Sequence, residues 1–261
     1  MKLKSLIAVS VFASLLAAGS AMAQASLDCS KLPNYNDLKQ AVIAAVREGA
    51  GANSGLGNQE WAAVVNRDGT VCAVIYSGPS RAAEWPGSRL IAAEKANTAN
   101  AFSAPNFALS TANIWAGAQP GGSLFGINQG PNPAAAFAGP ADRYGLQDDP
   151  MVGKAIGGVI VFGGGLALYN GKGELVGGLG LSGDTACADH VIAWKVRHAL
   201  KLDAVPMGVA PGPSDNMILD VQFGTAVSPS GYGHPTCKGG QAPDDIIKGL
   251  NDKIPTGPRH R

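Results

Sequence analysis

The chain has 261 residues, of which 46% are hydrophobic and only 15% are charged, against about 25% in a typical soluble domain. Its 20 Lys and Arg residues balance 19 Asp and Glu residues, which excludes nucleic-acid binding driven by bulk positive charge. The apolar content excludes a disordered or fibrous chain and is enough for the core of one domain or at most two.

Residues 1–23 have the pattern of a secretory signal peptide. Two lysines precede an apolar stretch over 6–18, and Ala21 and Ala23 supply the small residues of a cleavage site. A membrane anchor would need about 20 consecutive apolar residues, whereas this stretch is shorter and is interrupted by serines. We therefore expect export to the periplasm or the medium, a mature chain that begins near residue 24, and no membrane partner after cleavage.

Four cysteines follow this segment, and in an oxidising compartment they can form two disulfides: Cys29, Cys72, Cys187 and Cys237. The residues alone leave the pairing open. None of the cysteines lies in a C-x-x-C or C-x-x-C-H motif, so a thioredoxin-like couple and covalent c-type haem attachment have no support. Cys187 and His190 are one helical turn apart and could begin a zinc site, but a bridged cysteine beside a structural histidine is the simpler interpretation.

The first half of the mature chain is predicted to hold two strands between helices. Polar caps precede apolar residues at helical spacing, and two segments rich in β-branched and aromatic residues flank a turn sequence at 66–69. In chain order, the pattern predicts a helix over 36–48 capped by Asn36 or Asp37, strands over 61–65 and 70–76, a helix over 88–102 capped by Ser88, and a shorter helix over 109–116. Four prolines then mark residues 129–150 as a surface insertion.

The second half is predicted to hold three strands and a final helix. The strands are expected over 158–162, 166–169 and 174–181, and the helix from Asp184 or Thr185 to about Leu200. Adjacent strands can form hairpins and only the middle connection is long, which favours an antiparallel sheet over a doubly wound parallel one. Residues 203–261 are rich in proline and lack periodicity, so we expect an extended tail, tethered through Cys237.

One motif, GLGLSG at 178–183, matches the dinucleotide fingerprint G-x-G-x-x-G. Its context argues against a dinucleotide site, because the glycines begin inside the predicted strand and no parallel strand can follow the helix. Gly178 and Gly180 would instead leave room for something packed on the sheet, either a helix or a flat ligand. We expect that NAD and FAD do not bind.

The predicted helix over 88–102 carries a stripe of unusual composition. Ile91, Lys95, Thr98 and Phe102 follow one another at helical spacing, so a cation and a hydroxyl lie in line with two large apolar groups. One interpretation is a pocket wall that faces an anionic ligand. The other is a packed lysine stem whose ammonium reaches water.

Four ordered blocks resemble the GlcG/HbpS-like haem-binding family over about residues 35–202. They are WAAVVNRDG at 61–69, AAEKANTA at 92–99, QPGGSLFGIN at 119–128 and GGLGLSG at 177–183. The resemblance implies an α/β (α+β), profilin-like domain over 24–202, with an antiparallel sheet of about five strands flanked by helices. It also implies a homo-oligomer and non-covalent haem binding, in some members with a role in haem degradation or iron sensing.

The cysteines and the GHPTC segment at 233–237 are similar to an exported branch of that family, for which the resemblance implies the disulfides Cys29–Cys72 and Cys187–Cys237. Lys95 and Thr98 match the family's helix block. Some members use a histidine of the first helix as iron ligand, and residues 35–50 contain none. The remaining candidates for an axial ligand are His190, His198, His234 and His260. The expected cofactor-binding residues are Arg89, Ile91, Lys95, Thr98, Phe102 and His190.

Two function classes follow from these observations. The first is a periplasmic haem-binding protein for haem handling or for iron or redox sensing, in which Lys95 and Arg89 face the propionates. The second is an accessory or sensing module of an oxidation pathway that binds another small anionic ligand and never holds haem. We find no nucleophile with a plausible base, no H-E-x-x-H and no EF-hand loop, so no catalytic residue is assigned and enzyme activity stays open.

Overall fold

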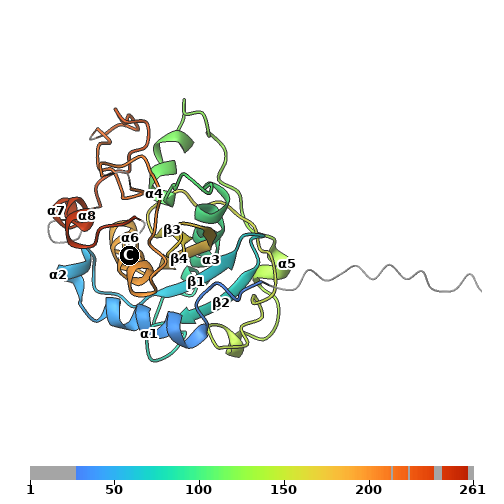
Figure 1. Ribbon diagram of the computed structural model, residues 1–261. Coiled ribbons are helices and arrows are strands. Elements are labelled where there is room, and N and C mark those ends of the chain that lie inside the picture. Colours follow the sequence, from blue (N-terminus) through green and yellow to red (C-terminus); the bar gives the residue numbers. More distant parts are fainter. Residues whose placement is uncertain (1–27, 213, 223, 238–242, 258–261) are drawn as a thin grey trace, which may run out of the picture.

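The structure is a computed structural model that describes residues 28–257 except 213, 223 and 238–242 (Figure 1). The expected signal peptide lies outside the described residues. The described chain forms a four-stranded sheet in the order β2-β1-β4-β3, with every neighbouring pair antiparallel. The strands are β1 (Trp61–Asn66), β2 (Val71–Tyr76), β3 (Gly165–Tyr169) and β4 (Leu175–Ser182).

Helices flank this sheet and continue into the tail. In chain order they are α1 (Tyr35–Val46), α2 (Ala50–Asn53), α3 (Ser88–Ala101), α4 (Thr111–Ile114), the 3-10 helix η1 (Ala116–Ala118), α5 (Pro133–Ala136), the 3-10 helix η2 (Ala141–Arg143), α6 (Ala186–Ala199), α7 (Pro243–Lys248) and α8 (Leu250–Lys253). The α/β class and the antiparallel sheet flanked by helices are therefore confirmed. None of the helices in the described part of the chain has the length and apolar character needed to cross a membrane.

Alternation along the strands divides the core between the two faces of the sheet. Ala62 and Val64 of β1 pack with α1 and α6 in one apolar cluster, whereas Ala63 and Val65 pack with α3 in another. Successive side chains of a strand point to opposite faces, so a strand that is apolar throughout must be covered on both. In Figure 1, α1 and α6 accordingly lie on one side of the sheet and α3 on the other.

The glycines of β4 are explained by the close approach of α3. A Cβ atom at Gly178 would collide with the backbone carbonyl of Ala96, and one at Gly180 with that of Ala92. Both glycines lie inside β4 and pair with β1. Of the two occupants that the sequence left open, a helix and a flat ligand, the structure has the helix. These glycines thus allow α3 to pack closely on β4, and the motif does not form a phosphate loop.

The expected fifth strand over 158–162 is wrong. Gly157 and Gly158 have φ angles of 66° and 82°, in the left-handed region that interrupts a strand. Val159 forms only an isolated bridge with Gln129, outside the sheet. The segment is apolar because Val159 and Val161 pack in a cluster with Ile114 and Ala118, and apolar composition alone does not distinguish such a connection from a strand.

Two helix caps also differ from expectation. Asn34 caps α1, since its side-chain oxygen accepts hydrogen bonds from the backbone N–H groups of Asn36 and Asp37, at 2.9 and 3.0 Å. Gly87 stands at the start of α3, and Ser88 is already inside the helix. Thr185 caps α6 as predicted, by accepting from the N–H of Ala188.

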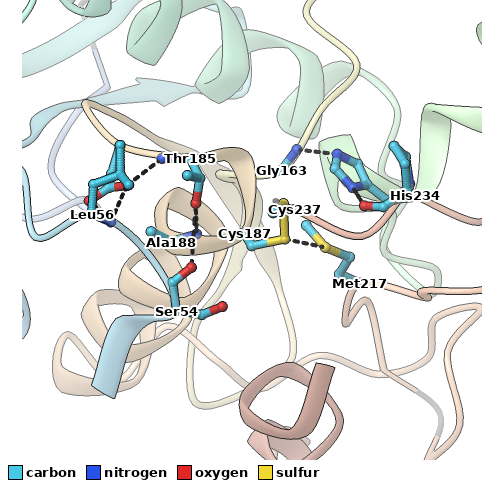
Figure 2. Close-up of a disulfide and its surroundings, with 11 residues drawn as sticks. Ser54, Leu56, Gly163, Thr185, Cys187, Ala188, Met217, His234 and Cys237 are labelled. Carbon is cyan, nitrogen blue, oxygen red and sulfur yellow. Dashed lines mark hydrogen bonds between the residues drawn. A yellow bond between two sulfur atoms is a disulfide. The ribbon is translucent and has the colours of Figure 1, made fainter. Parts of the chain in front are cut away.

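Two disulfides join Cys29 to Cys72 and Cys187 to Cys237, in agreement with the pairing that the family resemblance implies. The first ties the start of the described chain to β2. The second ties the tail to the first turn of α6, beside Met217 and His234 (Figure 2).

The tail is packed into the domain as well as tethered. Arg197 of α6 is fully buried and donates to both carboxylate oxygens of Asp215, at 2.6 and 2.8 Å. Ile247 of α7 and Leu250 of α8 are buried in the same apolar cluster as α1 and α6. These contacts place α7 and α8 beside α6 (Figure 1), so the tail contributes core and is not a loose extension.

Candidate functional site

Lys95 belongs to the predicted stripe on α3, and its ammonium lies inside the protein. Its Nζ is 2.6 Å from Oδ2 of Asp189 on α6 and donates to the carbonyl of Leu181 on β4 at 2.9 Å. The side chain is 0% exposed. This position corrects both expectations for its surroundings, the pocket wall and the ammonium at water. Direct contact with a ligand would require the ion pair to open, so Lys95 does not face a ligand site in this structure.

A second buried acid lies beside this pair. Glu60 is fully buried, and among the described residues neither of its carboxylate oxygens has a hydrogen-bond partner. Burial and the neighbouring charge of Asp189 raise the pKa of Glu60 well above its usual value. This raised pKa favours the neutral form of Glu60 beside the Lys95–Asp189 pair.

The other members of the stripe do not share one surface. The Thr98 hydroxyl donates to the carbonyl of Glu94 at 2.7 Å and accepts from the N–H of Ile160 at 3.0 Å, so it is used internally. Phe102 packs against a cluster that contains Ile114 and Val161, and Ile91 is only partly exposed. The structure thus separates residues that the helical spacing had grouped.

Arg89, the other expected propionate partner, is held by the insertion. Its Nε donates to Oδ2 of Asp149 at 2.8 Å, a second nitrogen pairs with Oδ1, and a third contact at 2.9 Å reaches the carbonyl of Ala136. Its guanidinium also lies 3.7 Å from the ring centroid of Tyr144. The charge of Arg89 is therefore matched within the protein, where it fixes residues of the 129–150 insertion against α3.

The three histidines in the described part of the chain fall into different environments. His190 is 0% exposed and its Nε2 lies 3.2 Å from both Asn216 Oδ1 and the N–H of Met217. The two ring nitrogens of His234 form hydrogen bonds with the N–H of Gly163 and the carbonyl of Pro235 (Figure 2). Burial lowers the pKa of His190 to about 3 and that of His234 to about 4, so both are neutral at pH 7.

His198 is the most exposed of the described histidines. Its side chain is 42% exposed, and its Nδ1 lies 2.6 Å from Asp203. The ring borders a cavity of about 440 Å³ between α6 and α8, together with Lys195 and Leu250. His260 lies outside the described residues.

The best-formed apolar cavity has a volume of about 380 Å³ and lies where β1, α3 and the insertion meet. Trp61 of β1 and Leu90 of α3 form two of its walls. The insertion supplies Phe137 and Tyr144, which approach from more than 40 positions along the chain. Small-molecule sites of this kind are concave, mostly apolar and about 300–1,000 Å³ in volume.

The lining of this cavity combines an exposed cation with an exposed aromatic ring. Arg81 is exposed and, within the residues that the structure describes, has no carboxylate partner. Phe137 is 64% exposed, and Trp85, in the same loop as Arg81, is 58% exposed. The arrangement suits a flat, apolar ligand that carries a negative charge.

Sequence reasoning missed Arg81, Trp85, Phe137 and Tyr144. Each lies in a loop or in the proline-rich insertion, where no periodicity connects it with the helix or strand it faces. The available signal was the occurrence of bulky aromatic residues in segments otherwise made of small and turn-forming residues.

Comparisons with known proteins agree with the resemblance read from the sequence. A family model described as haem-degrading HbpS-like proteins matches residues 35–197. The crystal structure of a PduOC–haem complex matches with 23% identity and a TM-score of 0.43, over 64% of this chain and 91% of that chain. The crystal structure of Klebsiella pneumoniae protein ORFY, a DUF336 protein, matches with 22% identity and a TM-score of 0.41, over 62% of this chain and 87% of that chain. No curated protein sequence matches.

Proposed function

The chain belongs to the family of HbpS-like haem-degrading proteins, and from this premise we propose that it binds haem non-covalently as an exported, periplasmic protein. The bound haem would be handled or used for iron or redox sensing. When bound, haem supplies an iron centre. The chain's own residues bind the ring and shield it from water.

The observation that carries the proposal is the 380 Å³ cavity with Arg81 in its lining. Haem is a flat apolar ring with two carboxylates at one edge, and the site offers apolar walls with one cation that has no carboxylate partner among the described residues. A cavity at the small end of the usual range encloses only part of such a ring. Phe137, which lines the cavity and is exposed, offers apolar surface to the rest.

Export and assembly are part of the same proposal. The signal-peptide pattern of residues 1–23 supports export, and two disulfides are typical of an oxidising compartment such as the periplasm. The exposed aromatic groups at the cavity also offer apolar surface to a second copy of the chain, in keeping with the homo-oligomer that the family resemblance implies. An intact mass that begins near residue 24 would support cleavage, and one that includes Met1 would contradict it.

A cavity-filling variant tests where haem binds. Gly87 is exposed at the border of the cavity, has open space around its Cβ position and no positive φ, so Gly87→Leu adds a side chain at the edge of the cavity without backbone strain. Gly171 has the same freedom in the β3–β4 turn, which makes Gly171→Leu the matched control. We expect haemin to bind the parent and Gly171→Leu with a saturable Soret change, and to bind Gly87→Leu at least about tenfold more weakly.

The outcomes separate the site from the function. Equal haemin binding by Gly87→Leu and the parent would place the haem elsewhere on the protein. A parent that gives no saturable Soret change would remove the haem proposal. The size of the cavity would then favour the second function, binding of a smaller apolar anion such as an aromatic carboxylate by an accessory or sensing module.

A further inference from the structure

Among the described residues that line the 380 Å³ cavity, only Tyr144 has a side-chain atom suited to bind iron. Trp61, Leu90 and Phe137 present apolar or ring surface, and the indole N–H of tryptophan only donates. Arg81 stays protonated and has no lone pair to offer a metal. Among the side chains that line the cavity, the phenol oxygen of Tyr144 is thus the one atom of a kind that binds iron.

The hydroxyl of Tyr144 is uncommitted. Across the part of the chain that the structure describes, it has no hydrogen-bond partner, and it is not sealed from solvent. Two of the other tyrosines use their hydroxyls inside the protein. The Tyr35 hydroxyl donates to the carbonyl of Gly145 at 3.1 Å, and that of Tyr169 donates to the carbonyl of Ala104 at 2.7 Å.

The ring that carries this hydroxyl is firmly held. The guanidinium of Arg89 lies against its face, and Asp149 fixes that guanidinium through two contacts. Asp149 also accepts the backbone N–H of Gly145, the next residue, at 2.7 Å. A ligand held by its surroundings before binding loses little freedom when the metal arrives.

We infer that Tyr144 is the axial ligand of the iron when haem occupies this cavity, an inference that rests on the proposed function. Tyrosine is an established axial ligand of haem iron. The phenol oxygen forms the bond to ferric iron, and its proton leaves to solvent, because metal ligands bind in their deprotonated form. This assignment accounts for a haem site without a histidine on its walls, and it separates the site from His190 and His234 in the interior.

The test compares ferric haemin with iron-free protoporphyrin IX on the mature protein. Tyr144→Phe keeps the ring and the Arg89 contact but removes the oxygen, and Tyr232→Phe, at an exposed tyrosine outside the cavity, is the matched control. We expect resonance Raman spectra of the haemin complex to show tyrosinate modes in the parent and in Tyr232→Phe, and to lose them in Tyr144→Phe. Haemin affinity should fall at least about tenfold in Tyr144→Phe, whereas protoporphyrin IX affinity should stay unchanged.

Each alternative result overturns a defined part of the reasoning. Tyrosinate modes and haemin affinity that survive in Tyr144→Phe would overturn the ligand assignment and leave haem binding intact. A haemin spectrum that changes in His198→Ala and not in Tyr144→Phe would assign the ligand to His198 and the cavity beside α8. If the parent binds neither porphyrin, the proposed function fails, and the assignment fails with it.

Discussion

Substituting Lys95 by alanine tests the buried ion pair that joins α3 to α6. The lysine and Asp189 are 0% and 1% exposed, and their charged atoms are 2.6 Å apart. Removing the lysine leaves Asp189 in the interior next to Glu60, whose carboxyl has no hydrogen-bond partner among the described residues. The structure thus places a residue that was expected to face a ligand in a buried ion pair between two helices.

The expected loss of stability is large. Breaking a buried pair by removing one partner costs about 3–5 kcal/mol, because the remaining charge is neither solvated nor matched. Lys248→Ala is the matched control, since Lys248 and Asp244 are 67% and 40% exposed and 4.0 Å apart. A surface pair of this kind is worth about 0–1 kcal/mol.

The assay is urea unfolding of the mature protein with its disulfides intact, followed by circular dichroism. We expect Lys95→Ala to lose about 3–5 kcal/mol of unfolding free energy and Lys248→Ala at most about 1 kcal/mol. The double variant Lys95→Met with Asp189→Leu should recover part of the loss, because it removes both charges. If Lys95→Ala has the same unfolding free energy as the parent, the buried ion pair does not stabilise the fold as argued.

Glu94 should make stability depend on pH, because burial raises the pKa of its carboxyl from 4.5 to about 7 in the folded protein. As the pH rises, the unfolded state loses this proton before the folded state does. The unfolding free energy therefore falls between about pH 4.5 and pH 7. Glu94→Gln should flatten that decline in urea titrations between pH 4.5 and 8, and an unchanged slope would contradict the shifted pKa. The Cys187–Cys237 disulfide closes a loop with a sequence separation of 50, so the variant with both cysteines replaced by serine should lose about 4 kcal/mol in the chain-entropy model. If the melting temperature of this variant equals that of the parent, the packing of Asp215 and Ile247 is enough to hold the tail.

Local patterns predicted most of the elements, because their signals lie within a few residues of each other. The turn at 66–69 and the β-branched residues beside it predicted the β1–β2 hairpin, and Thr185 predicted the start of α6. The glycines at 178–183 were correctly assigned to a strand, since they begin inside an apolar run. The segment 158–162 was assigned wrongly, because packing beside Ile114 and Ala118 gives a connection the same apolar composition as a strand.

The sequence by itself determined the fold class, the family and the order of most strands and helices, because periodicity, turn residues and ordered motifs are local properties. Only the tertiary structure decided what the chemically distinctive side chains do. The partner of Lys95 is 94 residues away on α6, and Phe137 and Tyr144 reach α3 from the insertion. Whether a lysine faces a ligand or a buried carboxylate depends on how α3 and α6 pack across the sheet. No spacing within either helix carries that information.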